Sequence, residues 1–285
     1  MKKTAIITLI AASAAIIMAS ACGNAKNNEA QNGGNSMEGV TVEKIDSMTL
    51  VAINDNDGDK RMPNKLFYGE TDSAKVERLS PEGSVPSSIS CFIVEVEGKK
   101  VLFDTGNGYD RGGKLVERMK AAGINPEDID YLMLTHFHGD HIGGMTKDGK
   151  PVFTRAEVYV PGKEYMAWQS MSNKNAEMAM DAMAAYGNKL HRFEYTDTLP
   201  LDIKPMAAPG HTPGHTVYQI GRLLIVGDLM HGFDLQIQDL GICPSYDMNS
   251  QQAVESRKKY VDYARRNKLI TAGMHFPGNG IKDKL

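Results

Sequence analysis

Three histidines and an aspartate lie within the six residues HFHGDH, from His136 to His141. The run DYLMLT directly before them has the composition of a buried strand, and three nearby glycines let the following loop fold tightly around an ion. Imidazole nitrogen and carboxylate oxygen are the ligands that a cation such as zinc accepts. The alternative is a polar loop whose histidines cap the next helix. Four candidate ligands in six positions favour a metal site.

The chain from Val40 onward predicts a layered α/β domain. Short apolar and β-branched runs bounded by turns predict strands, and helical spacing of apolar residues predicts helices. The expected strands cover residues 40–54, 89–96, 100–104, 130–135, 156–160, 201–207, 216–220, 222–226 and 269–274. The expected helices cover residues 112–122, 163–188 with a break near 172–173, and 249–267. Strands followed by alternating strands and helices are typical of a layered α/β fold.

Four further motifs extend the pattern along the chain. They are LFDTG at 102–106, PGHTPGH at 209–215, GD at 227–228 and GMH at 273–275. With LTHFHGDHIGG at 134–144, their order and spacing resemble those of the metallo-β-lactamase-fold hydrolases. The resemblance runs from about Val40 to the C-terminus. It implies a four-layer αββα sandwich, in which two sheets pack between outer helices.

The resemblance also implies a centre of two zinc ions, with manganese or iron as alternatives. In the implied arrangement one ion is held by His136, His138 and His211, the other is held by Asp140, His141 and His275, and Asp228 bridges them.

Three other residues are expected to support the metal site or to lie away from it. Asp104 is expected to accept the free N–H of a ligand imidazole and so to orient it. His215 is expected to be a packed neighbour of the ligands, and His191 a surface residue.

The implied chemistry is hydrolysis. Two cations about 3.5–4 Å apart can share a hydroxide and lower the pKa of bound water toward ~7. We expect this bridging hydroxide to attack the substrate while the cations polarise the scissile oxygen. Asp140 and Asp228 are the expected catalytic carboxylates, and Asp140 could also transfer a proton to the leaving group, although metal ligation competes with this. His231, three residues after Asp228, is a hypothetical proton donor on the substrate side.

The substrate is implied only as a class. HIGGMTKDGKPVF, GDLMH and AGMHFPGNG resemble the methyl parathion hydrolase-like and lactonase-like branch, which points to a small ester, lactone or phosphotriester. Quorum-quenching lactonases usually carry a tyrosine where this chain has His231. Aromatic and methionine side chains near Phe67–Tyr68, Tyr165–Trp168, His231–Phe233 and Phe276 are expected to line an apolar pocket, or else to belong to the core.

Two other classes of function stay open. One is a non-catalytic metal-binding surface lipoprotein of the same fold. The other is a mononuclear iron oxygenase.

The N-terminal residues predict export and lipid attachment. Lys2 and Lys3 precede an uncharged stretch, and small residues lead to Cys22, so residues 1–21 resemble a bacterial lipoprotein signal peptide. Residues 22–39 are rich in Asn and Gly and predict a flexible tether, and residues 40–285 are the expected hydrolase domain. We expect a lipid on Cys22 that anchors the protein to a bacterial membrane, facing the periplasm or the exterior. Plain secretion and an uncleaved anchor are the alternatives.

Charge and cysteine content limit the partners further. The formal net charge is −3 at pH 7, which argues against nucleic acid as the main partner. The expected partners are a small-molecule substrate and a membrane, and a homodimer is left open. Cys91 and Cys243 either pair in an oxidising compartment or remain two buried thiols.

Overall fold

The computed structural model describes residues 37–69 and 72–285. The expected signal peptide at 1–21 and residues 22–36 of the expected tether lie outside the described residues. Among the described residues, no helix is both long and apolar enough to cross a bilayer.

One sheet has seven strands in the order β1-β2-β5-β6-β7-β10-β11. The pairs from β1 to β6 are antiparallel, and the pairs from β6 to β11 are parallel. The strands are β1 (Val40–Ile45), β2 (Met48–Asn54), β5 (Ser90–Val96), β6 (Lys99–Phe103), β7 (Tyr131–Met133), β10 (Glu157–Pro161) and β11 (Leu190–Phe193). In β2, Leu50 and Ala52 belong to one core cluster, and Val51 and Ile53 belong to another. Both faces are apolar because both are covered.

The second sheet has five strands in the order β12-β13-β14-β15-β16. Its strands are β12 (Lys204–Ala207), β13 (Thr216–Ile220), β14 (Leu223–Gly227), β15 (Ile270–Gly273) and β16 (Ile281–Lys282). The pair β14–β15 is parallel, and the other pairs are antiparallel. A core between the two sheets joins Leu50, Phe92 and Phe103 of the first sheet to Tyr218 and Ile225 of the second.

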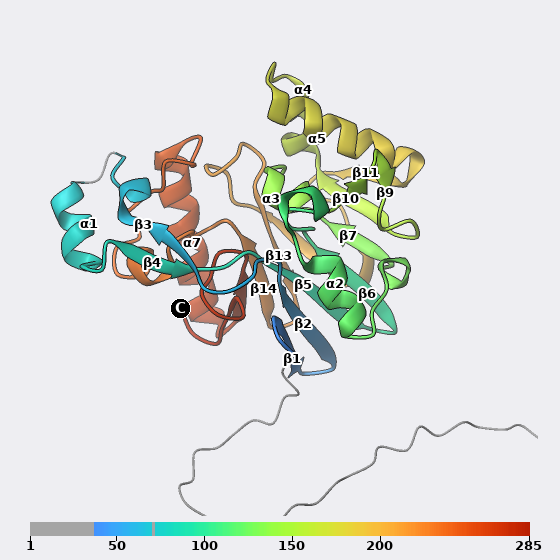
Figure 1. Cartoon of the computed structure of the whole chain (residues 1–285), viewed down its shortest axis with the longest axis horizontal. Helices are drawn as coiled ribbons and strands as arrows, with labels where there is room; N and C mark the ends of the chain where they lie inside the picture. The colour runs from blue at the N-terminus through green and yellow to red at the C-terminus, as the bar shows by residue number, and fades with distance from the viewer. Residues whose placement is uncertain (1–36, 70–71) are drawn as a thin grey trace, which may run out of the picture. The chain divides into compact units, whose positions relative to one another are not determined.

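Helices cover the outer face of each sheet (Figure 1). The first sheet packs against α2 (Leu115–Ala121), α4 (Gly162–Gln169) and α5 (Lys174–Ala185), and the second packs against α6 (Phe233–Gln236) and α7 (Ser250–Asn267). The order helix, sheet, sheet, helix confirms the predicted four-layer αββα sandwich.

An inserted hairpin lies between β2 and β5. It consists of β3 (Lys60–Pro63) and β4 (Ser84–Ser87), with η1 (Asn64–Phe67) and α1 (Ser73–Leu79) between them. Met62, Phe67 and Val85 form a small core of their own with Leu235 of α6. This hairpin was not predicted from the sequence, because its strands are short and largely polar.

The remaining short elements connect the layers. They are α3 (Gly139–Ile142), the ribbon β8 (Thr146–Lys147) and β9 (Lys150–Pro151), and the 3-10 turns η2 (Tyr109–Arg111), η3 (Pro126–Asp128), η4 (Gly187–Lys189) and η5 (Pro200–Asp202).

Three details refine the expected elements. The run 40–54 forms a hairpin of two strands, because the chain reverses at Asp46, which adopts a positive φ of 53°. The helix expected at 163–188 is broken as predicted, and the Asn173 side chain caps α5 by accepting the Ala176 N–H. Cys91 and Cys243 are separate buried thiols.

Candidate metal centre

The predicted ligands follow strands of both sheets. The loop from His136 to His141 comes after β7 and enters α3, and His211 lies between β12 and β13. Asp228 directly follows β14, and His275 follows β15 by one residue. Because β6 and β7 are parallel, as are β14 and β15, their carboxyl ends gather these loops at one edge of the sandwich.

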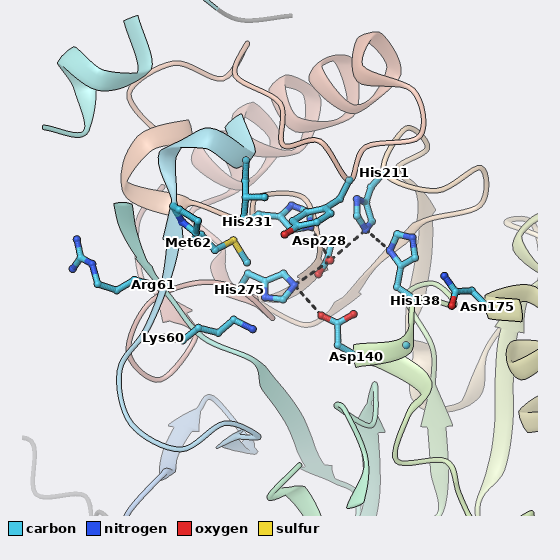
Figure 2. A pocket seen from close by; sticks show the side chains of 14 residues that line it. Lys60, Arg61, Met62, His138, Asp140, Asn175, His211, Asp228, His231 and His275 are labelled. Atoms are coloured by element: carbon cyan, nitrogen blue, oxygen red, sulfur yellow. Dashed lines mark hydrogen bonds and ion pairs between the residues drawn. The ribbon is translucent and has the colours of Figure 1, made fainter. Parts of the chain in front are cut away.

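Three imidazoles meet at the first half of the centre, and Figure 2 shows two of them, His138 and His211. The Nδ1 of His138 lies 2.8 Å from the Nε2 of His211 and 3.0 Å from the Nε2 of His136. The two Nε2 atoms lie 3.1 Å apart. Three nitrogens from two separate loops therefore point into one small volume.

The proton positions explain why these nitrogens suit a cation. The Nδ1 of His211 lies 3.0 Å from Asp247 Oδ1, an acceptor, so its proton is there. The Thr135 hydroxyl donates to Asp104 at 2.8 Å and can accept from the Nδ1 of His136 at 3.0 Å. The Nε2 atoms of His136 and His211 consequently face each other with lone pairs. A bound cation turns this repulsion into ligation.

The second half repeats this arrangement. The Nδ1 of His141 lies 2.8 Å from the Asp104 carboxylate, the contact that the family resemblance implies. The Nδ1 of His275 lies 2.8 Å from the Ser88 carbonyl oxygen, which can only accept. The Nε2 atoms of both rings are therefore free to bind a cation. That of His275 lies 3.4 Å from Asp140 Oδ2.

Asp228 lies between the two halves. Its Oδ2 is 3.3 Å from His211 Nε2 and 3.2 Å from His275 Nε2, and its Oδ1 is 3.0 Å from His141 Nε2. That Oδ1 and the Nε2 of His141 are buried and make no hydrogen bond to any of the described residues. Buried polar atoms are rarely left without a partner, so this pair fits a bound cation.

The backbone before Asp228 is closely packed. Gly227 has a positive φ of 52°, and a Cβ there would lie 2.6 Å from His215 Nε2. The Nε2 of His215 accepts the Asp228 N–H at 3.1 Å, and its Nδ1 faces the Ala208 carbonyl oxygen at 3.0 Å. Both nitrogens of His215 are therefore used, as expected of a packed neighbour of the ligands. His191 is half-exposed and lies 2.6 Å from Glu157, away from the centre.

Burial and charge set the protonation states. Burial, reinforced by His211, lowers the pKa of His138 to about 3. Burial opposes protonation of His275, but the Asp228 and Asp140 charges outweigh it and raise its pKa to about 9. Burial also favours a neutral Asp228, but His141, His275 and His231 hold its pKa well below the usual range. Ionised carboxylates beside imidazoles whose ring nitrogens can give up a proton to a cation form a ligand set that suits a divalent metal.

His231 lies against the second half of the centre. Its Nε2 is 3.1 Å from Asp228 Oδ2, and its ring stacks on that of His275 with centroids 4.9 Å apart. Burial lowers its pKa to about 4, so the ring is neutral at pH 7. The placement agrees with a residue that touches both the ligands and the pocket, and its role as a proton donor stays a prediction.

Two supporting carboxylates were not predicted. Asp247 accepts from His211 on one oxygen, and its other oxygen lies 3.3 Å from the buried guanidinium of Arg257. Glu164 of α4 is fully buried and accepts four hydrogen bonds, from the Phe137 and Gly214 backbone N–H groups, the Trp168 indole and the Thr212 hydroxyl. An acidic residue on the apolar side of an expected helix is the one sequence signal for Glu164, and Asp247 has none.

A pocket of about 600 Å³ opens over the ligands. Its walls come from the inserted hairpin, α3, the start of α5 and the loop before α7, and they include Lys60, Met62, Leu66, Asn175 and Tyr246. Of the two alternatives stated for the aromatic side chains, the core holds for most of them. Phe67, Phe233 and Phe276 are buried in core clusters, because they fill the space under the inserted hairpin and α7. Of that expected set, His231 lines this pocket, and Trp168 lines a neighbouring hollow beside His138.

The family model of the metallo-beta-lactamase superfamily matches residues 85–266, more than half of the chain. An N-acyl homoserine lactonase of Bacillus sp. is 26% identical over 222 residues, which cover 67% of this chain and 82% of the relative. A hydroxyacylglutathione hydrolase of Dechloromonas aromatica is 30% identical over 118 residues, which cover 41% of this chain and 36% of the relative.

Two solved structures share the fold at 26% identity and a TM-score of 0.78. One is AidC, a dizinc quorum-quenching lactonase in complex with a product, N-hexnoyl-L-homoserine, and the match covers 85% of this chain and 92% of AidC. The other is the hydrolase AbOPH of the beta lactamase superfamily, where the match covers 87% and 93%.

Proposed function

Because the chain belongs to the metallo-beta-lactamase superfamily and is a metal-dependent hydrolase, we propose that it is a two-zinc enzyme that cleaves a small ester, lactone or phosphotriester. One observation carries the proposal. Asp228 lies between two groups of imidazoles whose ring nitrogens converge on it. Its Oδ1 and the Nε2 of His141 are 3.0 Å apart and buried, and neither atom makes a hydrogen bond among the described residues. A site for a single cation would not need both groups.

The roles of the ligands follow from the two groups. When bound, a pair of divalent cations lowers the pKa of coordinated water and polarises the scissile oxygen. The residues proposed to hold the first cation are His136, His138 and His211, those for the second are Asp140, His141 and His275, and Asp228 serves both.

The chain's own residues supply orientation and proton transfer. Asp104 and Asp247 hold the Nδ1 protons of His141 and His211, which leaves each Nε2 as the ligand atom. His231 lines the pocket beside Asp228, and we propose that it is a proton donor to the substrate or leaving group. Asp140, whose side chain is 30% exposed, is the carboxylate that could pass a proton to the leaving group.

A lactone is the first substrate to test. Its support is similarity to relatives that are named lactonases, together with a pocket large enough for a small molecule. The same metal chemistry also serves esters and phosphotriesters, so fold and centre alone do not select among them.

The test combines metal analysis with a substrate panel. Protein purified without added metal is assayed for zinc, manganese and iron per chain, and then for turnover of a chromogenic ester, an acyl lactone and a phosphotriester. Two divalent ions and turnover of at least one substrate support the proposal. Bound metal without turnover on a broad panel favours a non-catalytic binding protein, and one iron per chain favours an oxygenase.

A further inference from the structure

We propose that Lys60 binds an anionic oxygen group of the substrate, a carboxylate or a phosphate, so that the preferred substrate carries a negative charge beyond its scissile bond. This inference deepens the proposed hydrolase function and rests on it. The positions of Lys60, its neighbours in the hairpin and the pocket charges carry the argument.

The inserted hairpin holds Lys60 next to the centre. Lys60 is the first residue of β3 and pairs directly with Ser87 of β4. The Ser87 hydroxyl lies 3.3 Å from the carbonyl oxygens of both His231 and His275, and the next residue, Ser88, accepts from the His275 ring. The backbone of Lys60 is therefore fixed relative to the ligands by contacts of its partner strand.

The two basic residues of β3 point in opposite directions (Figure 2). The Lys60 ammonium extends toward Asp140 and His275, whereas the Arg61 guanidinium points away from them. Arg61 is engaged by Glu82 at 2.6 Å and by Ser84. Side chains alternate along a strand, so Lys60 points toward the centre, whereas Arg61, which also lines the pocket, points away from it and is paired with Glu82.

The Lys60 ammonium makes no hydrogen bond or ion pair with any residue of 37–69 or 72–285. Burial lowers its pKa, while the more distant charges of Asp140, Asp228 and Asp55 act in the opposite direction. A partly desolvated cation without a direct partner gains from an anion that completes a charge-assisted hydrogen bond.

The charge of the pocket favours an anionic ligand over a neutral one. Its only carboxylates among the described residues are Asp140 and Asp228, and both belong to the ligand set. Two divalent cations outweigh two carboxylate charges, so the loaded centre is positive and Lys60 adds to that field. The competing explanation is that Lys60 merely balances Asp140 and Asp228 in the metal-free protein.

The experiment compares two esters that differ in one charge. Zinc-loaded protein is assayed with the para-nitrophenyl monoester of adipic acid and with the matching ester of adipamic acid, whose terminal amide is neutral. The variants are Lys60→Met, which removes the charge, and Lys60→Arg, which keeps it. Lys65→Met is the matched control, because Lys65 is an exposed lysine of the same hairpin. Calorimetric titration with adipate, adipamide and inorganic phosphate measures binding without turnover.

We expect the wild type to favour the charged ester by roughly tenfold or more in kcat/KM, mainly through KM, as for a hydrogen bond between charged groups. Lys60→Met loses this preference, Lys60→Arg keeps part of it, and Lys65→Met keeps it fully. High salt reduces the preference. In the calorimetric titrations, the anion that binds more tightly, adipate or phosphate, is the one that the Lys60 ammonium prefers.

Three results overturn the inference: a wild type that favours the neutral ester, an unchanged preference in Lys60→Met, or a Lys60→Met variant that alters only zinc affinity. If zinc-loaded protein cleaves neither these esters nor the lactone and phosphotriester, the hydrolase proposal fails instead. The calorimetric comparison of wild type with Lys60→Met then still decides whether Lys60 binds anions.

Discussion

The Thr212 hydroxyl donates a 2.9 Å hydrogen bond to the fully buried carboxylate of Glu164. The same carboxylate accepts the Phe137 N–H, so a single side chain of α4 joins the loop of His136 and His138 to the loop of His211. The loops that carry the three imidazoles of the proposed first cation site are thus joined by a residue that, among the described residues, makes no hydrogen bond to those rings.

Replacing Glu164 by Gln should weaken the first cation site. Each carboxylate oxygen accepts at least one N–H, so an amide NH₂ in either position leaves a buried N–H without an acceptor, at a cost of about 1–3 kcal/mol. We expect the metal-free variant to melt at a lower temperature than the metal-free wild type. We also expect the zinc-loaded variant to lose one of its two zinc ions at a lower chelator concentration than the wild type. Glu177→Gln, an exposed change on α5, is the control. Equal zinc retention in the two variants would contradict the linking role.

Asp247→Asn should lower metal affinity through His211. The carboxylate accepts the Nδ1 proton of His211 at 3.0 Å, and an amide can present an N–H there and favour the wrong tautomer. Loss of such a partner typically costs about 10–100-fold in metal affinity or activity. Zinc dissociation constants measured against a chromophoric chelator check this, with Asp181→Asn on the exposed side of α5 for comparison. A melting temperature that falls while zinc affinity stays constant would mean that Asp247 serves only Arg257.

Asp228→Ala should remove metal and nearly all activity. Its two oxygens face both imidazole groups, so truncation deprives both cations of a ligand and leaves the histidines to repel one another. Metal binding stabilises the folded state, and we expect the melting temperature in the presence of zinc to fall as well. His136→Ala should behave similarly. Unchanged metal content and melting temperature in Asp228→Ala would rule out the bridging assignment.

The residues of the candidate centre were predictable because their signals are local. Each follows an apolar strand and belongs to a short motif of characteristic spacing, and parallel strands bring such loops to one edge. Asp247 has no such signal. It lies in an irregular loop, and its contact with His211 spans 36 residues of chain. A lone aspartate in an irregular loop looks the same whether it faces water or a metal-binding histidine.

The pocket walls were harder to predict because hydrophobicity does not distinguish a core from a binding surface. Phe67 and Phe276 are as buried as any side chain of the sandwich, whereas Lys60 and Asn175 line the pocket. The hairpin that carries Lys60 has short polar strands, which resemble a loop in composition. Its place over the centre depends on long-range contacts of Ser87 and Ser88 with the His275 segment.

The predicted membrane attachment through a lipid on Cys22 can be tested by replacing that cysteine. If Cys22 carries a lipid, Cys22→Ala should move the protein from the membrane fraction to the soluble fraction of the exported material, because the anchoring acyl chains are lost. Detergent partitioning and intact-mass measurement of the mature protein check this. A wild type that has neither a lipid mass nor membrane association would favour plain secretion.

The pH dependence of the metal-free protein should differ from that of the loaded protein. The Asp228 and Asp140 charges, acting against burial, raise the pKa of His275 to about 9, above its usual value near 6.5. A raised folded-state pKa adds stability that is fully present below the unfolded pKa and is lost as pH rises through the folded one. The metal-free melting temperature should therefore decline between about pH 7 and pH 10.

In the loaded protein the His275 ligand is already neutral, so the same decline should be absent. Zinc affinity should rise with pH up to about 9, because binding displaces a proton from His275. Activity should fall below about pH 6 as ligand imidazoles compete for protons. Melting curves and calorimetric proton release with and without zinc check these expectations. Parallel curves for the two forms would show that His275 is not protonated in the metal-free centre.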